Sequence, residues 1–177
     1  ACEGKVQWLE TSYSNLVQGC EHWRTLLVSE DTVVVIDDVA AASEREISLH
    51  WLLAKEPALS CDGEYLLKVD EDISCWMTVE SDQDCLEHSV VKASPNSPRG
   101  WYSRHYLQRL PATSIVTVTE AKSAVFVTCF STSKARLSVF EDVVEVGKTK
   151  GGFRIEMCNR AMYEDMIKSV VLLEATS

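Results

Sequence analysis

The most constraining feature of this sequence is a series of short β-branched and aromatic runs, separated by turn residues. The run TVVVI at 32–36 lies between acidic pairs, which is typical of a buried strand. Similar runs predict further strands at 47–52, 65–69, 75–79, 86–91, 114–119, 124–130, 136–140, 143–146 and 153–157. We therefore predict an all-β fold, an antiparallel β-sandwich of many short strands.

The connections between these runs carry turn chemistry, at CDGE 61–64, SPNSP 94–98, Gly147 and the glycine pair 151–152. The GKT at 147–149 resembles the end of a phosphate loop, but Asp142 stands where the first glycine is needed, so we predict a turn. Residues 159–173 fit a short helix or a last strand at 167–173, and we favour the strand.

Length and charge limit the organisation and the partners. A chain of 177 residues fits a single domain, which we predict to span residues 1–177. A formal net charge of -10 repels polyanions, so we expect neither nucleic acid nor membrane as a partner. Residues 1–5 lack the features of a signal peptide, and we expect any export signal to lie upstream.

The cysteine and histidine patterns give no metal or catalytic motif. The seven cysteines include no CxxC pair, so we predict no zinc site; free buried thiols are favoured over a disulfide such as Cys61–Cys75. We expect His22 and His50 to lie in strands as hydrogen-bonded structural residues. No set of residues converges on catalysis, and we predict no catalytic residue, metal or cofactor.

The segment PRGWYSRHYLQRLPA at 98–112 has two interpretations. One is a fold element, a strand with its entering turn, in which Gly100 takes an unusual backbone angle and one face belongs to the core. The other is a glycan contact made by Trp101, Tyr102, Arg104 and Tyr106. Strand alternation predicts that the last three of these share a face. We favour the fold element, and keep the four residues as the candidate ligand-binding site.

Several motifs resemble those of one enzyme family. These are YSNL at 13–16, HWR at 22–24, VVVIDDV at 33–39, SLHWLL at 48–53, and GWYSRHY at 100–106 followed by LPA at 110–112. In this order they resemble the C-terminal β-sandwich of heparinase II/III-like polysaccharide lyases, over roughly residues 10–130.

The resemblance implies a non-catalytic role. In that family a helical toroid supplies the catalytic tyrosine and an asparagine or histidine, and early strands supply a further histidine and a metal site; none of these motifs is present here. We therefore predict a C-terminal sandwich that supports upstream catalytic domains of the same protein, with polysaccharide as a further candidate partner. The alternatives are a stand-alone carbohydrate-binding module and a structural or protein-interaction sandwich. A periplasmic or secreted location follows if the parent lyase is exported.

Overall fold

The computed structural model describes residues 6–15, 19–71, 73–140, 143–148, 151–157 and 167–173, and this part of the chain contains β-strands and no helix. It therefore has no helix that is long and apolar enough to cross a membrane. The strands are β1 (Gln7–Asn15), β2 (Cys20–Val28), β3 (Thr32–Leu53), β4 (Leu59–Cys61), β5 (Glu64–Lys68), β6 (Ser74–Ser81), β7 (Glu87–Lys92), β8 (Trp101–Tyr102), β9 (Leu110–Pro111), β10 (Thr113–Ser131), β11 (Arg136–Phe140), β12 (Val143–Lys148), β13 (Gly151–Met157) and β14 (Ile167–Leu173). The predicted all-β class is confirmed.

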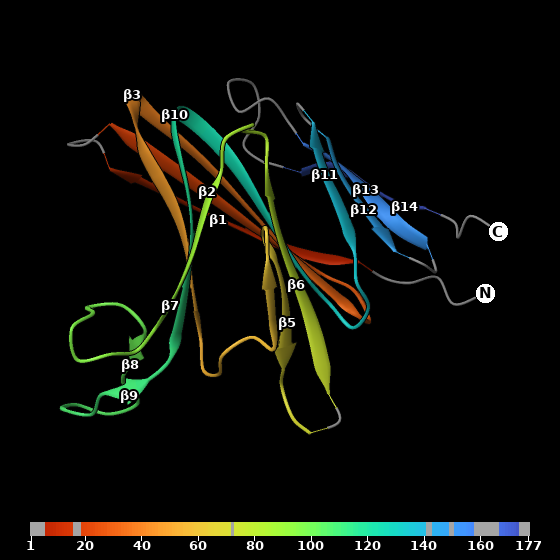
Figure 1. The fold of residues 1–177 in the computed structure, drawn as a ribbon. Helices are drawn as coiled ribbons and strands as arrows, with labels where there is room; N and C mark the ends of the chain where they lie inside the picture. The colour runs from red at the N-terminus through yellow and green to blue at the C-terminus, as the bar shows by residue number, and fades with distance from the viewer. Residues whose placement is uncertain are drawn as a thin grey trace.

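The larger sheet is antiparallel, in the order β1-β2-β3-β10-β6-β5-β4 (Figure 1). Its central pair, β3 and β10, is paired over almost its whole length, from Thr113 opposite Leu53 to Ser131 opposite Thr32. One register shift, between Ala121 and Ser123, marks the point where this long ribbon bends.

Because of this bend, the two halves of the β3–β10 ribbon lie in different layers of the fold (Figure 1). On the side away from β3, residues 113–118 of β10 pair with β7, whereas residues 126–131 pair with β6. Residues 45–53 of β3, residues 113–121 of β10 and all of β7 form one part of the sheet, which we call the front ribbon. The first half of β3 and the second half of β10 remain in the back of the sheet with β1, β2, β5 and β6.

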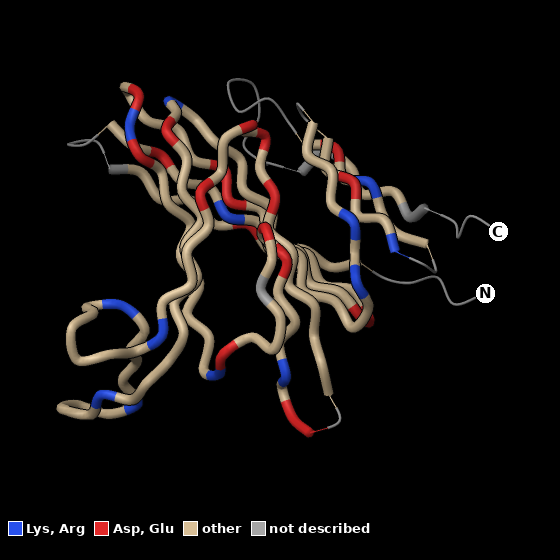
Figure 2. The backbone as a smooth tube through the Cα atoms, in the orientation of Figure 1, with Lys and Arg blue, Asp and Glu red and all other residues tan. Residues whose placement is uncertain are grey.

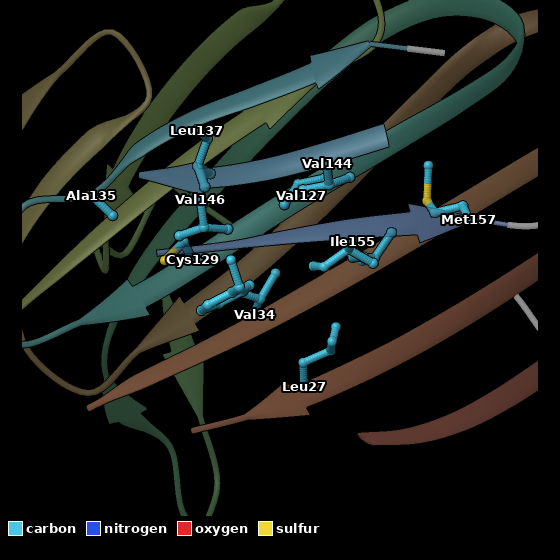
Figure 3. Close-up of a cluster of buried hydrophobic side chains, with 12 residues drawn as sticks. Leu27, Val34, Val127, Cys129, Ala135, Leu137, Val144, Val146, Ile155 and Met157 are labelled. Atoms are coloured by element: carbon cyan, nitrogen blue, oxygen red, sulfur yellow. The ribbon is translucent and has the colours of Figure 1, made fainter. Parts of the chain in front are cut away.

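The first hydrophobic core lies between the back of the larger sheet and a smaller antiparallel sheet, β11-β12-β13-β14 (Figure 3). Val34, Ile36 and Val127 face Val146 and Ile155 across this interface, and all five are fully buried. Fully burying an aliphatic side chain of this size stabilises the fold by about 1.5–3 kcal/mol. This alternate-residue packing explains why period-two runs dominate the sequence.

A second hydrophobic core lies on the opposite face of the larger sheet. Here Leu49 and Ile115 of the front ribbon join Tyr65, Met77 and Phe126 of the back strands. The ribbon therefore folds over β5 and β6, and the larger sheet buries side chains on both faces.

The structure confirms most of the predicted strands and corrects some details. The last segment is a strand at Ile167–Leu173, and residues 158–166 lie outside the described part. Gly147 and the glycine pair 151–152 were predicted as turns, which is wrong. Gly147 lies inside β12, where it pairs with Arg136 and Gly152, and Gly151 and Gly152 begin β13. The strand Gln7–Asn15 was not predicted at all.

The cysteines also differ in part from the prediction. All five described cysteines are free, and Cys61 and Cys75 do not form a disulfide. Only Cys129 among them is buried, whereas Cys61 and Cys85 are exposed, so the expectation of buried thiols is wrong for these two. Burial raises the pKa of the Cys129 thiol to about 12.

Candidate functional site: an arginine–aromatic lobe

Residues 93–112, which we call the lobe, connect β7 to β10 at one end of the front ribbon. The lobe protrudes from the sandwich and contains the small β8–β9 pair, with Trp101 opposite Pro111 and Tyr102 opposite Leu110 (Figure 1). At its base the Ala93 amide donates to the Ala112 carbonyl at 3.1 Å. None of its aromatic side chains belongs to either hydrophobic core.

Gly100 and Arg99 attach the lobe to the sandwich. Gly100 has a φ of +80°, and a Cβ there would lie 2.7 Å from the Ala93 amide nitrogen, so only glycine fits without strain. Arg99 Nε donates to Ser114 Oγ at 3.0 Å and Nη1 donates to Ser89 Oγ at 3.2 Å. The Arg99 guanidinium is therefore engaged in holding the lobe on the ribbon.

The other two arginines lie against aromatic rings. The Arg109 guanidinium carbon is 4.0 Å from the centroid of the Trp101 ring, and that of Arg104 is 5.7 Å from the Tyr102 ring. Trp101 is fixed in turn, because its indole Nε1 donates to the Ser97 carbonyl at 3.0 Å. Cation–π contacts of this kind orient a guanidinium while leaving its edge in solvent.

The tip of the lobe is apolar and exposed. Tyr106 is 93% exposed and Leu107 91% exposed, and Leu107 has a φ of +62°. A left-handed conformation at a leucine carries some backbone strain, and here it reverses the chain between β8 and β9.

The structure brings together two of the four predicted site residues, Tyr102 and Arg104, whereas Trp101 lies against Arg109. Trp101 and Tyr102 lie in β8, and Tyr106 stands apart at the tip. The predicted alternation through residue 106 is wrong, because the strand ends at Tyr102 and a turn follows. The expectation that one face belongs to the core is also wrong. Arg109 was not in the predicted set; the only sequence signal for it is its place as an arginine in the same carboxylate-free segment, and the β8–β9 pairing is what brings it to Trp101.

The lobe is cationic in an acidic protein. Residues 88–119 contain no Asp or Glu, and Figure 2 shows the lobe with basic positions and no acidic ones. Arg104 and Arg109 are both exposed. Two oriented guanidinium groups beside aromatic faces are suited to carboxylate or sulfate groups on a ring-shaped ligand.

A polar cluster lies on β2 and β3, on the face of the larger sheet that also carries the second hydrophobic core. Arg24 Nε and Nη2 donate to the two Asp37 carboxylate oxygens at 2.6 and 3.0 Å, and His22 Nε2 donates to Asp37 Oδ1 at 2.7 Å. The Asp37 side chain is only 2% exposed. The guanidinium carbon of Arg24 also lies 5.6 Å from the centroid of the Trp51 ring. The carboxylate is thus fully engaged within the sheet, which fits a structural role.

The other strand histidine is also hydrogen-bonded, as predicted. His50 Nε2 and Ser114 Oγ are 2.6 Å apart, next to the Arg99 contact. Burial, and then the nearby Arg99 charge, lower the pKa of His50. Among the residues that the structure describes, no group of histidine, cysteine, aspartate or glutamate side chains has an arrangement suited to a metal ion.

Comparison with known proteins identifies the family. The model of the family described as heparinase II/III-like, C-terminal, matches residues 2–146. The chain belongs to this family. A search of curated protein sequences finds no significant match.

Solved structures support the fold of this heparinase II/III-like domain. A heparinase III (the BT4657 gene product) is 18% identical, with a TM-score of 0.65 over 82% of this chain. The same protein with methylated lysines is 15% identical, with a TM-score of 0.64 over 97% of this chain. The chain spans only 24% and 26% of those two chains, about a quarter of their length.

Proposed function

We propose that this chain is a non-catalytic C-terminal β-sandwich domain of a heparinase II/III-like polysaccharide lyase. In this role residues 1–177 form one unit that supports the catalytic domains of the same protein and contacts the glycan through the lobe. The family match and the likeness to heparinase III, a protein about four times longer, support the first part. The lobe supports the second.

The observation that carries the glycan contact is the pair of stacked guanidinium groups. Arg104 on Tyr102 and Arg109 on Trp101 give two exposed cations and two ring faces on a segment without a carboxylate. The lobe also projects away from the sandwich, so its exposed side is open to a chain-like ligand (Figure 2).

The contact between the lobe and the glycan strengthens glycan binding by the longer protein, even though two surface cations bind a glycan weakly on their own. Tethering to the catalytic domains gives the lobe an effective ligand concentration in the millimolar range once the glycan is bound elsewhere. The lobe then lowers KM without taking part in bond cleavage.

The distribution of the tryptophan residues argues against a stand-alone carbohydrate-binding module. Such a module presents exposed aromatic rings on one face, but Trp23, Trp51, Trp76 and Trp101 are all only partly exposed. Trp8 is 53% exposed and stands alone among the tryptophans in this respect.

The test uses the longer protein that contains this chain, with heparan sulfate, heparin or alginate, whichever it cleaves. Replacing both Arg104 and Arg109 by alanine removes about 1 kcal/mol of contact energy, which corresponds to an increase in KM of about fivefold. We expect kcat to stay unchanged. Arg136→Ala, at an exposed position on β11, is the matched control. An unchanged KM in the double variant would remove the lobe from the glycan contact, and a fall in kcat would contradict its accessory role.

A further inference from the structure

Among the described strands, β1 forms one edge of the larger sheet. β1 is the terminal strand of the larger sheet, and all nine of its residues pair with β2, from Gln7 opposite Val28 to Asn15 opposite Cys20. No described strand pairs with its other side. The backbone N–H and C=O groups that point outward from β1 therefore have no strand partner within the part of the chain that the structure describes.

Large apolar side chains gather on the same strand. Leu9 is 68% exposed, Tyr13 is 63% exposed and Trp8 is 53% exposed. Leu9 and Tyr13 are four residues apart, so they share one face, and their neighbours on β2 are Leu26 and His22. Trp8 points to the opposite face of the sheet.

The strand has few of the features that normally protect an edge. Its sequence, QWLETSYSN, contains no proline, no lysine and a single charged residue, Glu10, and its register with β2 has no bulge. The opposite edge of the larger sheet is different, because β4 is only three residues long. A nine-residue, weakly protected and partly apolar edge is expected to be covered in the working protein.

We propose that β1 is the docking edge onto which the rest of the parent lyase adds a β-strand, which extends the larger sheet beyond β1. This inference rests on the proposed function, because it takes the occupant from the polypeptide outside these 177 residues. The heparinase III chains, of which this chain spans about a quarter, have ample further length to supply such a strand.

The geometry also defines the chemistry of the added strand. Its main chain hydrogen-bonds with the outer edge of β1. Its alternate side chains on one face are apolar and pack against Leu9 and Tyr13, and one apolar residue on the other face covers Trp8. This attachment would fix the sandwich to the catalytic part of the protein through the sheet rather than through the lobe.

Hydrogen–deuterium exchange of the peptide spanning residues 7–15 tests this proposal. In the isolated chain the outward amides of β1 should exchange rapidly, and in the longer protein the same amides should exchange at least tenfold more slowly. Equal rates in the two proteins would overturn the proposal. Slow exchange that appears in the isolated chain only as its concentration rises would assign the edge to a second copy, and would also overturn it.

Two variants of the longer protein make the test specific. Leu9→Lys combined with Tyr13→Lys should return β1 exchange to the rate of the isolated chain, with an unchanged circular dichroism spectrum. Phe140→Lys is the matched control, because Phe140 is 69% exposed at the end of an edge strand of the smaller sheet. Protection of β1 that survives the double lysine variant would contradict the side-chain part of the proposal. The KM test of the lobe has a separate readout, so failure here and failure of the glycan contact are distinguishable.

Discussion

We predict that the isolated chain binds heparin only weakly, because no more than two arginines of the lobe are able to contact it. Of the three in the lobe, Arg99 is engaged with Ser89 and Ser114, which leaves Arg104 and Arg109. An exposed ion pair contributes about 0–1 kcal/mol, so the two together provide at most about 2 kcal/mol. Millimolar binding needs about 4 kcal/mol and micromolar binding about 8 kcal/mol. We therefore expect a dissociation constant weaker than about 1 mM at physiological ionic strength.

Tryptophan fluorescence measures this binding directly, because Trp101 lies 4.0 Å from the Arg109 guanidinium carbon. Lowering the salt concentration from about 0.15 M to 0.01 M lengthens the Debye length from about 8 to 30 Å. At low salt we expect a weak heparin-dependent signal that Arg104→Ala reduces and Arg136→Ala leaves unchanged. The net charge of -10 limits it even there. A saturable change at micromolar heparin and physiological salt, lost in Arg104→Ala, would refute this reasoning.

Three further predictions concern the sandwich itself. Asp37→Asn should lower the free energy of unfolding by about 2 kcal/mol and the melting temperature by about 4–8 °C, because it removes the carboxylate that accepts hydrogen bonds from Arg24 and His22. An unchanged melting curve would contradict the structural role of Asp37. Gly152→Ala should cost about 3 kcal/mol in chemical denaturation, because its Cβ would lie 2.0 Å from a backbone carbonyl oxygen. Gly147→Ala, whose nearest contact is 3.8 Å, should change stability by less than about 0.5 kcal/mol, and equal effects of the two would argue against this packing. Peptide mapping after thiol labelling at about pH 8 should find Cys85 modified and Cys129 unmodified until the protein unfolds. The reason is that burial raises the pKa of the Cys129 thiol to about 12. Rapid labelling of Cys129 in the native protein would contradict its burial.

The strands were predictable where a local pattern reports burial. The β-branched run at 32–36 lies in a strand between two layers, as its composition indicates. The sequence did not show that residues 32–53 form one strand, because Glu44, Arg45 and Glu46 look like a break. They are exposed at the bend of the ribbon, and only the long-range pairing with β10 keeps them in a strand.

The candidate site was predictable in composition but not in geometry. The sequence 98–112 identified an aromatic and cationic segment, and Gly100 was expected to adopt an unusual backbone angle, as it does. The alternation failed because the strand ends at Tyr102; the chain then reverses at Leu107, which returns Arg109 to Trp101. Such a reversal depends on a single left-handed residue at an exposed tip, for which a leucine gives no local signal.

The accessory role itself is tested most directly by an assay for lyase activity in the isolated chain. Incubation with heparin, heparan sulfate and alginate, followed by ultraviolet absorbance of the unsaturated uronate product, measures bond cleavage without assumptions about binding. The proposed function predicts no increase above a buffer blank for any of the three glycans, because the family's catalytic tyrosine, asparagine and metal motifs are not matched in these residues. Formation of unsaturated product by the purified chain would contradict a non-catalytic domain.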